Sequence, residues 1–192
     1  MRQALIQSYV QQLRASFGPL RPLVSEEELR ALYDAGEFGR MMYRVKESLH
    51  LDCRVRLGLV NSGGCNPQAP AWVVRPDVMP IFGSEAFRQT EVTVFIRKPF
   101  LAKATFDATV IAMAHELCHP LIDAMHHPLW DKEEAVDLLA MLLGYRDFFV
   151  TGCRTVRKVN PRFHGGTTYY LHEVGYLSFE EVSYAATYMT YR

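Results

Sequence analysis

Five consecutive residues near the middle of the chain have the types and spacing of a metal site. His115, Glu116 and His119 stand in the sequence HELCH, within the apolar stretch Thr105–Asp123. In a helix, residues four apart lie on one face, so the two imidazoles can converge on one point. Glu116 lies one position further round, where its carboxylate can reach a water at that point without binding the metal. The pattern predicts two ligands and a general base of a catalytic zinc site.

A catalytic zinc site needs a third protein ligand, and the residues after the motif offer several. The compact pattern H-E-x-x-H-x-x-G-x-x-H requires Gly at position 122 and His at position 125. The chain has Ile122 and Met125 there, so this pattern fails. His126 and His127 are open alternatives, although they lie one and two residues beyond the required position.

The segment EEAVD predicts a carboxylate ligand on the next helix. Its Glu133 and Asp137 are four apart and therefore share a helix face. One carboxylate can bind the metal, while the other accepts the free N–H of a ligand histidine and fixes its tautomer. Glu134 is the rival ligand. We favour Glu133, because Glu134 already has a role in a capping box that Asp131 is expected to open.

H-E-x-x-H on one helix followed by E-x-x-x-D on the next resembles the gluzincin zinc metallopeptidases. The short chain with a small sheet before the motif is similar to compact ImmA/IrrE-type and minimal gluzincin domains, over roughly residues 53–146. Pro120 and the short spacing between the two motifs depart from the family pattern. The residues that the resemblance carries over are the zinc ligands His115, His119 and Glu133, the general base Glu116, and the partner of a ligand histidine, Asp137.

The resemblance implies a zinc-dependent peptidase that hydrolyses a peptide bond in a protein or peptide substrate. Glu116 would take a proton from the zinc-bound water and pass it to the leaving amine. The developing oxyanion also needs a hydrogen-bond donor. Tyr169 and His172, which follow His164-Gly165-Gly166, are candidates for that role, with packing as their alternative role. The alternative function is a metal-binding regulatory or protein-interaction module that hydrolyses nothing, and the intact Glu116 argues against it.

Composition narrows the kind of partner that the chain can have. Of its 192 residues, 49% are hydrophobic and 22% are charged, which is enough apolar sequence for one sizeable core. Lys+Arg and Asp+Glu both number 21, so the formal net charge is zero. This balance attracts neither nucleic acid nor an anionic membrane, and no apolar run approaches the length of a transmembrane helix. The expected partner is the protein or peptide substrate that the resemblance implies.

The cysteines indicate a reducing compartment. Cys53, Cys65, Cys118 and Cys153 include no C-x-x-C pair, and the N-terminal stretch reads as an amphipathic helix rather than a signal peptide. We therefore expect reduced thiols and a cytoplasmic protein. Cys118 is expected to be a small buried hydrophobe. Cys65 lies in a predicted loop, either without a role or within reach of the zinc as an inhibitory or redox-sensitive thiolate.

Hydrophobic periodicity predicts an α+β fold in one domain, with a small three-stranded sheet packed on the motif helix. The resemblance implies that this domain is zincin-like. Strands are predicted over residues 54–60, 71–74 and 91–97, of which the last has the most β-branched and aromatic side chains. As an edge strand, that last strand would bind an extended peptide by β-addition. The expected parts are an N-terminal helical part (1–50), the sheet (51–104), the active-site helices (105–150) and a C-terminal helical part (151–192).

Capping signals set the expected helix boundaries. Ser25 and Glu28 form one predicted capping box, and Ser178 and Glu181 another. Thr105 is the expected N-cap of the motif helix. Pro120 is expected to kink or end that helix, because proline lacks the N–H that a helix interior requires. Two last helices are predicted over residues 168–176 and 182–191, after a connecting segment over 154–162.

Overall fold

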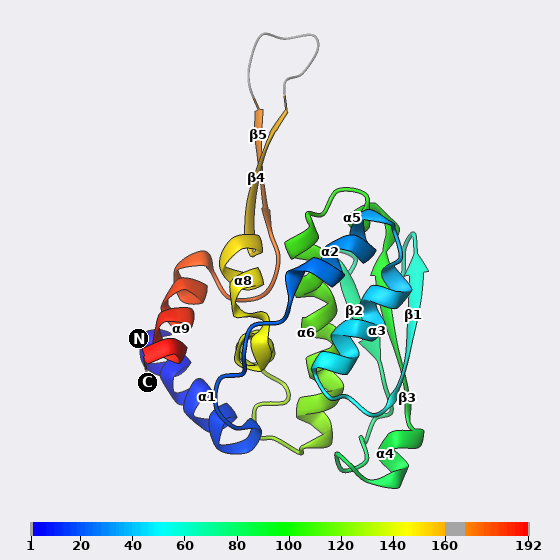
Figure 1. Ribbon diagram of the computed structural model, residues 1–192, viewed down its shortest axis with the longest axis vertical. Helices are drawn as coiled ribbons and strands as arrows, with labels where there is room; N and C mark the ends of the chain where they lie inside the picture. The colour runs from blue at the N-terminus through cyan, green and yellow to red at the C-terminus, as the bar shows by residue number, and fades with distance from the viewer. Residues whose placement is uncertain (1, 160–167, 192) are drawn as a thin grey trace.

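A computed structural model describes residues 2–159 and 168–191 of the chain, and for residues 155–159 and 168–172 it describes the backbone alone. The fold is α+β, as predicted, with a bundle of helices, a small sheet and a projecting hairpin (Figure 1). The helices are α1 (Arg2–Phe17), α2 (Glu26–Asp34), α3 (Phe38–Ser48), α4 (Glu85–Gln89), α5 (Lys98–Leu101), α6 (Phe106–Ala124), α7 (Glu133–Ala140), α8 (Arg146–Gly152) and α9 (Phe179–Tyr191), with a π-helical turn η1 (Met141–Tyr145) after α7. The strands are β1 (Arg54–Val60), β2 (Ala71–Val74), β3 (Glu91–Arg97), β4 (Arg154–Val159) and β5 (Thr168–Glu173).

The sheet is mixed, and its strand order is β1-β3-β2. β3 pairs in parallel with β1 and antiparallel with β2, so the prediction that residues 91–97 form an edge strand is wrong. The β-branched side chains of β3 reflect burial instead, since Val92, Val94 and Ile96 are fully buried. Among the described residues the free edges of this sheet belong to β1 and β2.

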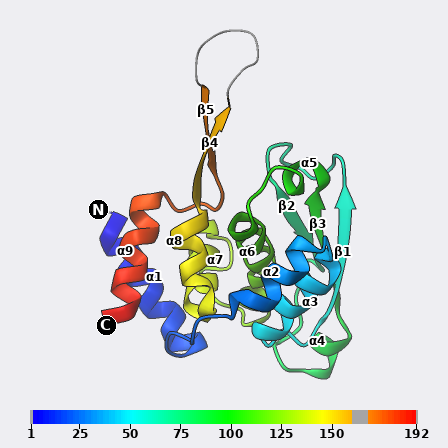
Figure 2. The same cartoon turned by 45° about the horizontal axis from the view of Figure 1, so that its top comes forward.

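Helix α6 lies at the centre of the molecule, with the sheet on one side and α7 and α8 on the other (Figure 2). It packs against β2 and β3 on one side and against α7 and α8 on the other. Of its 19 residues, 16 are buried, which explains why its sequence is apolar all round rather than amphipathic. Thr105 caps it as predicted, because its hydroxyl oxygen accepts a hydrogen bond from the Ala108 amide at 3.2 Å. Apolar as it is, neither α6 nor any other described helix is long and apolar enough to cross a membrane.

Of the two outcomes predicted at Pro120, a kink or an end, the structure excludes the end. The helix continues to Ala124, because the turn after the proline places Leu121, Ile122 and Ala124 in the core. The burial of these three side chains offsets the one backbone hydrogen bond that the proline removes, a loss of about 3 kcal/mol in a helix interior. His119 therefore stays within a regular helix.

The C-terminal part is not wholly helical. Residues 154–159 and 168–173, predicted as a connection and a helix, form the antiparallel strands β4 and β5 of a hairpin that projects from the body (Figures 1 and 2). Each strand depends on the other for its hydrogen bonds, and helical spacing within either segment cannot reveal that pairing. The last helix, α9, has the predicted reciprocal capping box: the Ser178 amide donates to Glu181 at 2.9 Å, and the Glu181 amide donates to Ser178 Oγ at 3.3 Å.

The capping box predicted at Ser25 is only half present. Ser25 is the N-cap residue of α2, but its side chain makes no capping hydrogen bond. Glu28 is drawn away from the helix terminus by Arg44 of α3, whose Nε lies 2.7 Å from the carboxylate. A tertiary ion pair has replaced the local interaction.

Candidate metal centre

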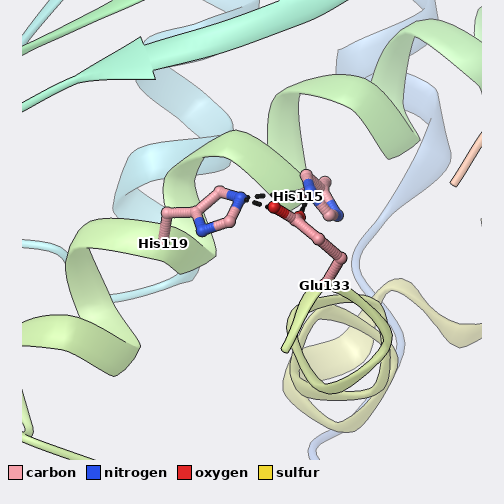
Figure 3. Close-up of side chains that lie close together, drawn as sticks. All are labelled: His115, His119 and Glu133. Atoms are coloured by element: carbon pink, nitrogen blue, oxygen red, sulfur yellow. Dashed lines mark hydrogen bonds and ion pairs between the residues drawn. The ribbon is translucent and has the colours of Figure 1, made fainter. Parts of the chain in front are cut away.

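Three side chains from α6 and α7 converge on one point. His115 Nε2 lies 3.1 Å from Glu133 Oε2 and 3.2 Å from His119 Nε2, and His119 Nε2 lies 3.3 Å from Glu133 Oε2 (Figure 3). The two histidines stand one turn apart on α6, and Glu133 is the first residue of α7. The structure thus brings together the three residues that the sequence suggested as metal ligands.

The triangle of donor atoms could hold a metal ion, and its dimensions are compatible with zinc. Zinc bonds to imidazole nitrogen and carboxylate oxygen are about 2.0–2.1 Å long, so two ligands at a tetrahedral angle lie about 3.3–3.4 Å apart. The three observed separations, 3.1, 3.2 and 3.3 Å, are close to that value. Two nitrogens and one carboxylate oxygen also leave a fourth position open, which is the donor set of catalytic rather than structural zinc sites.

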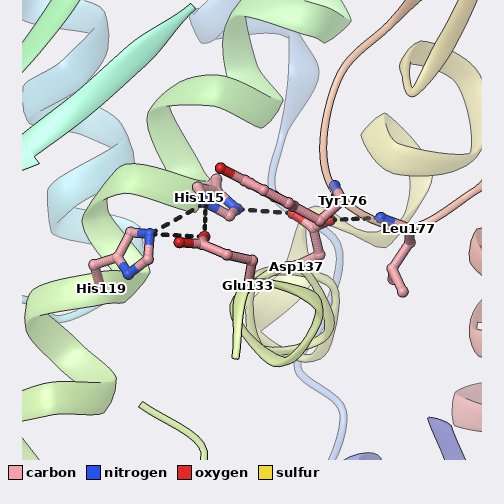
Figure 4. A network of polar contacts seen from close by, with 6 residues as sticks. All are labelled: His115, His119, Glu133, Asp137, Tyr176 and Leu177. Atoms are coloured by element: carbon pink, nitrogen blue, oxygen red, sulfur yellow. Dashed lines mark hydrogen bonds and ion pairs between the residues drawn. The ribbon is translucent and has the colours of Figure 1, made fainter. Parts of the chain in front are cut away.

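Asp137 fixes the orientation of His115. Its Oδ1 accepts a hydrogen bond from His115 Nδ1 at 2.8 Å, which directs the Nε2 lone pair toward the triangle (Figure 4). Its Oδ2 accepts from the backbone amides of Tyr176 at 2.6 Å and Leu177 at 3.1 Å. Asp137 is fully buried, and all three donors reach it from within the protein. The side chain therefore links the metal centre to the segment that follows β5.

Gly175 allows that segment to approach Asp137. It has a φ of +96°, which favours glycine, and an added Cβ would lie 3.0 Å from Asp137 Oδ2. Any side chain here would push the carboxylate away from the Tyr176 and Leu177 amides.

Hydrogen bonds within the cluster shift the pKa values of His115 and Glu133. Burial alone would lower the pKa of His115, but its hydrogen bonds with Asp137 and Glu133 raise that pKa to about 10. Partial burial alone would raise the pKa of Glu133, yet hydrogen bonds with His115 and His119 hold it well below its ordinary value. A cation entering the site must therefore displace a proton from His115.

Glu116 is a buried carboxylate without a hydrogen-bond partner among the described residues. Its residue is only 8% exposed, yet it lines the cleft beside the triangle. Burial raises its pKa, and the neighbouring charges of His115 and His119 limit the rise. A carboxylate in these surroundings is suited to accept a proton from a water bound between it and the triangle.

Tyr176 is a site residue that the sequence did not reveal. Its ring stacks on that of His115, with 5.3 Å between centroids and 21° between planes (Figure 4). Burial raises the pKa of its hydroxyl to about 12, and the negative charges of Glu133 and Glu116 contribute to the rise, so the group remains a hydrogen-bond donor at neutral pH. No motif marks Tyr176, because a turn after a hairpin places it over the site.

The cleft over the metal centre consists of two adjoining hollows. One has a volume of about 200 Å³ and the other about 360 Å³, and both are lined by His115, Glu116 and Tyr176. The smaller hollow extends toward Ile111 on α6, and the larger one toward His119 and Glu133. Ala71 of the edge strand β2 lines both hollows, and Trp72 and Val73 line the larger one, so β2 borders the cleft.

Arg97 holds the loop that forms the sheet-side wall of this cleft. At the end of β3, its guanidinium donates to the backbone carbonyls of Gly63, Asn66 and Ala69, at 3.1 Å to Asn66 and 2.7 Å to Ala69. It also lies 5.1 Å from the ring of Trp72, another residue of the cleft wall. One side chain thereby sets the course of residues 63–69.

The two alternative histidines lie elsewhere. His127 is buried, its Nδ1 accepts a hydrogen bond from the Leu129 amide at 3.2 Å, and its ring packs 5.8 Å from that of Phe17. His126 is exposed, with a φ of 47°, in the turn after α6. Neither belongs to the group of donor atoms that lie within 4.8 Å of one another.

The capping box expected to occupy Glu134 is absent. Lys132, not Asp131, is the N-cap residue of α7, and no side chain caps the helix. Asp131 pairs with Lys132 at 3.0 Å, while Glu134 points toward Arg2 at 3.8 Å. The stated reason for preferring Glu133 was therefore wrong, although Glu133 is the residue that reaches the histidines.

Of the predicted oxyanion donors, Tyr169 and His172 belong to β5, but their side chains lie outside the described part of the chain, as does the segment His164-Gly165-Gly166. Cys118 is buried, as expected. Cys65 is exposed and lines the larger hollow, outside the group of metal-type donors.

The chain matches no protein-family model, no curated protein and no solved structure. The function is therefore inferred from the geometry and chemistry of the site itself.

Proposed function

We propose that this protein is a zinc metallopeptidase of the gluzincin type with a zincin-like fold, and that it hydrolyses peptide bonds in a protein or peptide substrate. His115, His119 and Glu133 hold the zinc, and Asp137 orients His115. The donor set and the separations of the three ligand atoms support zinc, which binds nitrogen and carboxylate oxygen readily and prefers four ligands.

The observation that carries the proposal is the unpartnered, buried carboxylate of Glu116 beside the three donors. A purely structural metal site requires no additional carboxylate with a raised pKa next to an open position. The carboxylate is mostly buried, lacks a hydrogen-bond partner among the described residues and borders the open cleft, so a role in chemistry explains its presence better than packing does.

Each residue has a definite task in hydrolysis. The zinc, when bound, lowers the pKa of water and polarises a carbonyl group. Glu116 accepts the proton of the attacking water and delivers it to the leaving amine nitrogen. Tyr176 donates a hydrogen bond to the oxyanion that develops on the scissile carbonyl, a role that its neutral hydroxyl suits.

The substrate lies extended beside β2. This strand is at the edge of the sheet and borders the cleft from Ala71 to Val73, so its free backbone groups can pair with a peptide. β2 thus takes the place of β3 as the proposed peptide-binding strand, because β3 lies in the middle of the sheet. The free state of all four cysteines also supports a cytoplasmic location.

The test combines metal analysis with peptide cleavage. Purified protein should hold one zinc per chain, and wild type should cleave members of a peptide mixture, with chelator abolishing cleavage and zinc restoring it. Glu116→Gln should retain the zinc and lose cleavage by about 100-fold to 10,000-fold, the contribution typical of a general base. Cleavage that persists in Glu116→Gln would refute the assignment of the base.

The second candidate is a metal-binding regulatory or protein-interaction module that catalyses nothing. This candidate is favoured by the hydrogen bonds of Asp137 with the Tyr176 and Leu177 amides, at the base of the projecting hairpin. Through them, metal binding would stabilise the base of the hairpin. Stoichiometric zinc without cleavage of any peptide would favour this module over the peptidase.

A further inference from the structure

The cleft contains a cation that the proposed hydrolysis leaves unused. Arg75 directly follows β2 and lines the larger hollow together with Glu116 and His119. Its Nε donates to Asp123 Oδ2 at 2.8 Å, and the two side chains are 23% and 19% exposed. The pair is therefore mostly buried in the wall of the cleft but still reachable from it.

The guanidinium of Arg75 has free donors. Asp123 engages only Nε, and no described residue accepts a hydrogen bond from either terminal nitrogen. Guanidinium groups present paired N–H donors that match the two oxygens of a carboxylate. Because Asp123 already fixes the orientation of the side chain, binding a second carboxylate would lose little further rotamer entropy.

The position of Arg75 relates it to the scissile bond. Its partner Asp123 stands one turn of α6 beyond His119, about 6 Å along the helix axis. Along β2, Arg75 is four residues from Ala71, which borders both hollows, or about 13 Å in an extended strand. These distances of about 6 to 13 Å correspond to two to four residues of an extended peptide. A substrate residue that contacts Arg75 would therefore lie two to four residues from the scissile bond beside Glu116.

The charges near Arg75 are mostly paired within the protein. Asp123 neutralises the single positive charge of Arg75, and Asp131 is paired with Lys132 at 3.0 Å. A divalent ion at the triangle would offset two of the three negative charges of Glu133, Glu116 and Asp137. The larger hollow is also lined by Trp72 and Trp130, of which Trp130 is 49% exposed. Apolar side chains strengthen the interaction of a guanidinium with a carboxylate where they exclude water.

We propose that Arg75 is a specificity-determining residue that binds a carboxylate of the peptide substrate two to four residues from the scissile bond. The proposal rests on the proposed peptidase function. The carboxylate is either an Asp or Glu side chain or the C-terminus of the peptide.

Binding can be measured without turnover. The chain has two tryptophans, Trp72 and Trp130, and both line this hollow, so intrinsic fluorescence reports its occupancy. The probes are alanine-based octapeptides with one Glu or one Gln at each successive position, acetylated and amidated, together with a Gln peptide with a free C-terminus. They are titrated into zinc-loaded Glu116→Gln protein. A Glu peptide, or the free C-terminus, should bind at least about tenfold more tightly than the capped Gln peptide.

The second variant assigns this preference to Arg75. Adding Arg75→Met should bring the Glu and Gln peptides within twofold, and Arg75→Lys should retain only part of the preference, because lysine lacks the paired donors. Unchanged zinc stoichiometry verifies that these variants fold. Arg56→Met is the matched control, since Arg56 pairs with Glu91 outside the cleft, and it should leave the preference unchanged.

Equal affinity for all the peptides, or a preference that survives Arg75→Met, would overturn the carboxylate site. Failure of the peptidase proposal looks different. In that case wild type cleaves none of the peptides, while the Arg75-dependent preference in binding persists. Cleavage of Glu and Gln peptides at equal rates would instead preserve the peptidase and remove the site.

Discussion

The cleft has two walls, and one charged side chain organises the backbone behind each. On the helical side, Asp137 accepts hydrogen bonds from His115 and from the amides of Tyr176 and Leu177. On the sheet side, Arg97 donates to three carbonyls of the loop over residues 63–69. On the helical wall a carboxylate accepts hydrogen bonds from N–H groups, and on the sheet wall a guanidinium donates hydrogen bonds to C=O groups.

The two walls differ in burial and in what they position. Asp137 is fully buried and hydrogen-bonds directly to His115, whereas Arg97 is partly exposed and its guanidinium contacts the loop and Trp72. Loss of the buried anion leaves several donors without partners, while water can replace much of what Arg97 does. We therefore expect metal affinity to depend on the first wall and substrate binding on the second.

Asp137→Ala should have the largest effect. It leaves His115 Nδ1 and two buried amides unpaired, so we expect a loss of about 3 kcal/mol or more in unfolding free energy and of roughly 10-fold to 100-fold in zinc affinity. Urea denaturation and competition with a chromogenic chelator measure the two quantities. Asp137→Asn, which keeps one acceptor, should fall between wild type and Asp137→Ala. Unchanged zinc affinity would show that the helical wall does not govern the metal.

The pH dependence of the metal-free protein tests the same wall. The pKa of His115 is raised from 6.5 to about 10, so its stabilising contribution is complete below pH 6.5 and is lost as pH rises toward 10. Unfolding free energy should fall between pH 7 and 8.5 by at most about 1.4 kcal/mol per pH unit. His115→Gln should flatten the slope, and a slope that rises with pH would contradict the assignment.

Gly175→Ala should have an intermediate effect. The new Cβ meets Asp137 Oδ2 at 3.0 Å, and the φ of +96° disfavours a side chain, so we expect a loss of about 1–3 kcal/mol in stability together with weaker zinc binding. Gly39→Ala is the matched control: Gly39 lies in α3 with nothing within 4 Å of an added Cβ. That change should stabilise the protein by up to about 1 kcal/mol. If the two variants behave alike, close contact with Asp137 is not what constrains position 175.

Arg97→Met should have the smallest effect on the metal and a local effect on the loop. We expect zinc affinity within twofold of wild type, a loss of about 1 kcal/mol in stability, and faster hydrogen exchange over residues 61–70. Peptide binding by zinc-loaded protein should weaken severalfold. A loss of zinc affinity as large as that of Asp137→Ala would erase the distinction between the two walls.

Local sequence was sufficient for the paired histidines and for the three strands of the sheet. The spacing of His115 and His119 is a property of a single helix, and the strands over 54–60, 71–74 and 91–97 were marked by period and residue type. Expectations failed where a distant partner decided the outcome. Pro120 stays helical because the next turn is buried, and β5 is a strand because β4 lies beside it.

By itself, the sequence determined which side chains can hold a metal and which carboxylate stands next to them, because helical periodicity orders residues a turn apart. Only the tertiary structure decided that Glu133 rather than Glu134, His126 or His127 completes the triangle. It also placed Tyr176 on His115 and Arg75 in the cleft. These neighbours come from elements far apart in the chain, and their contacts depend on how α6, α7 and the sheet pack, which no local period encodes.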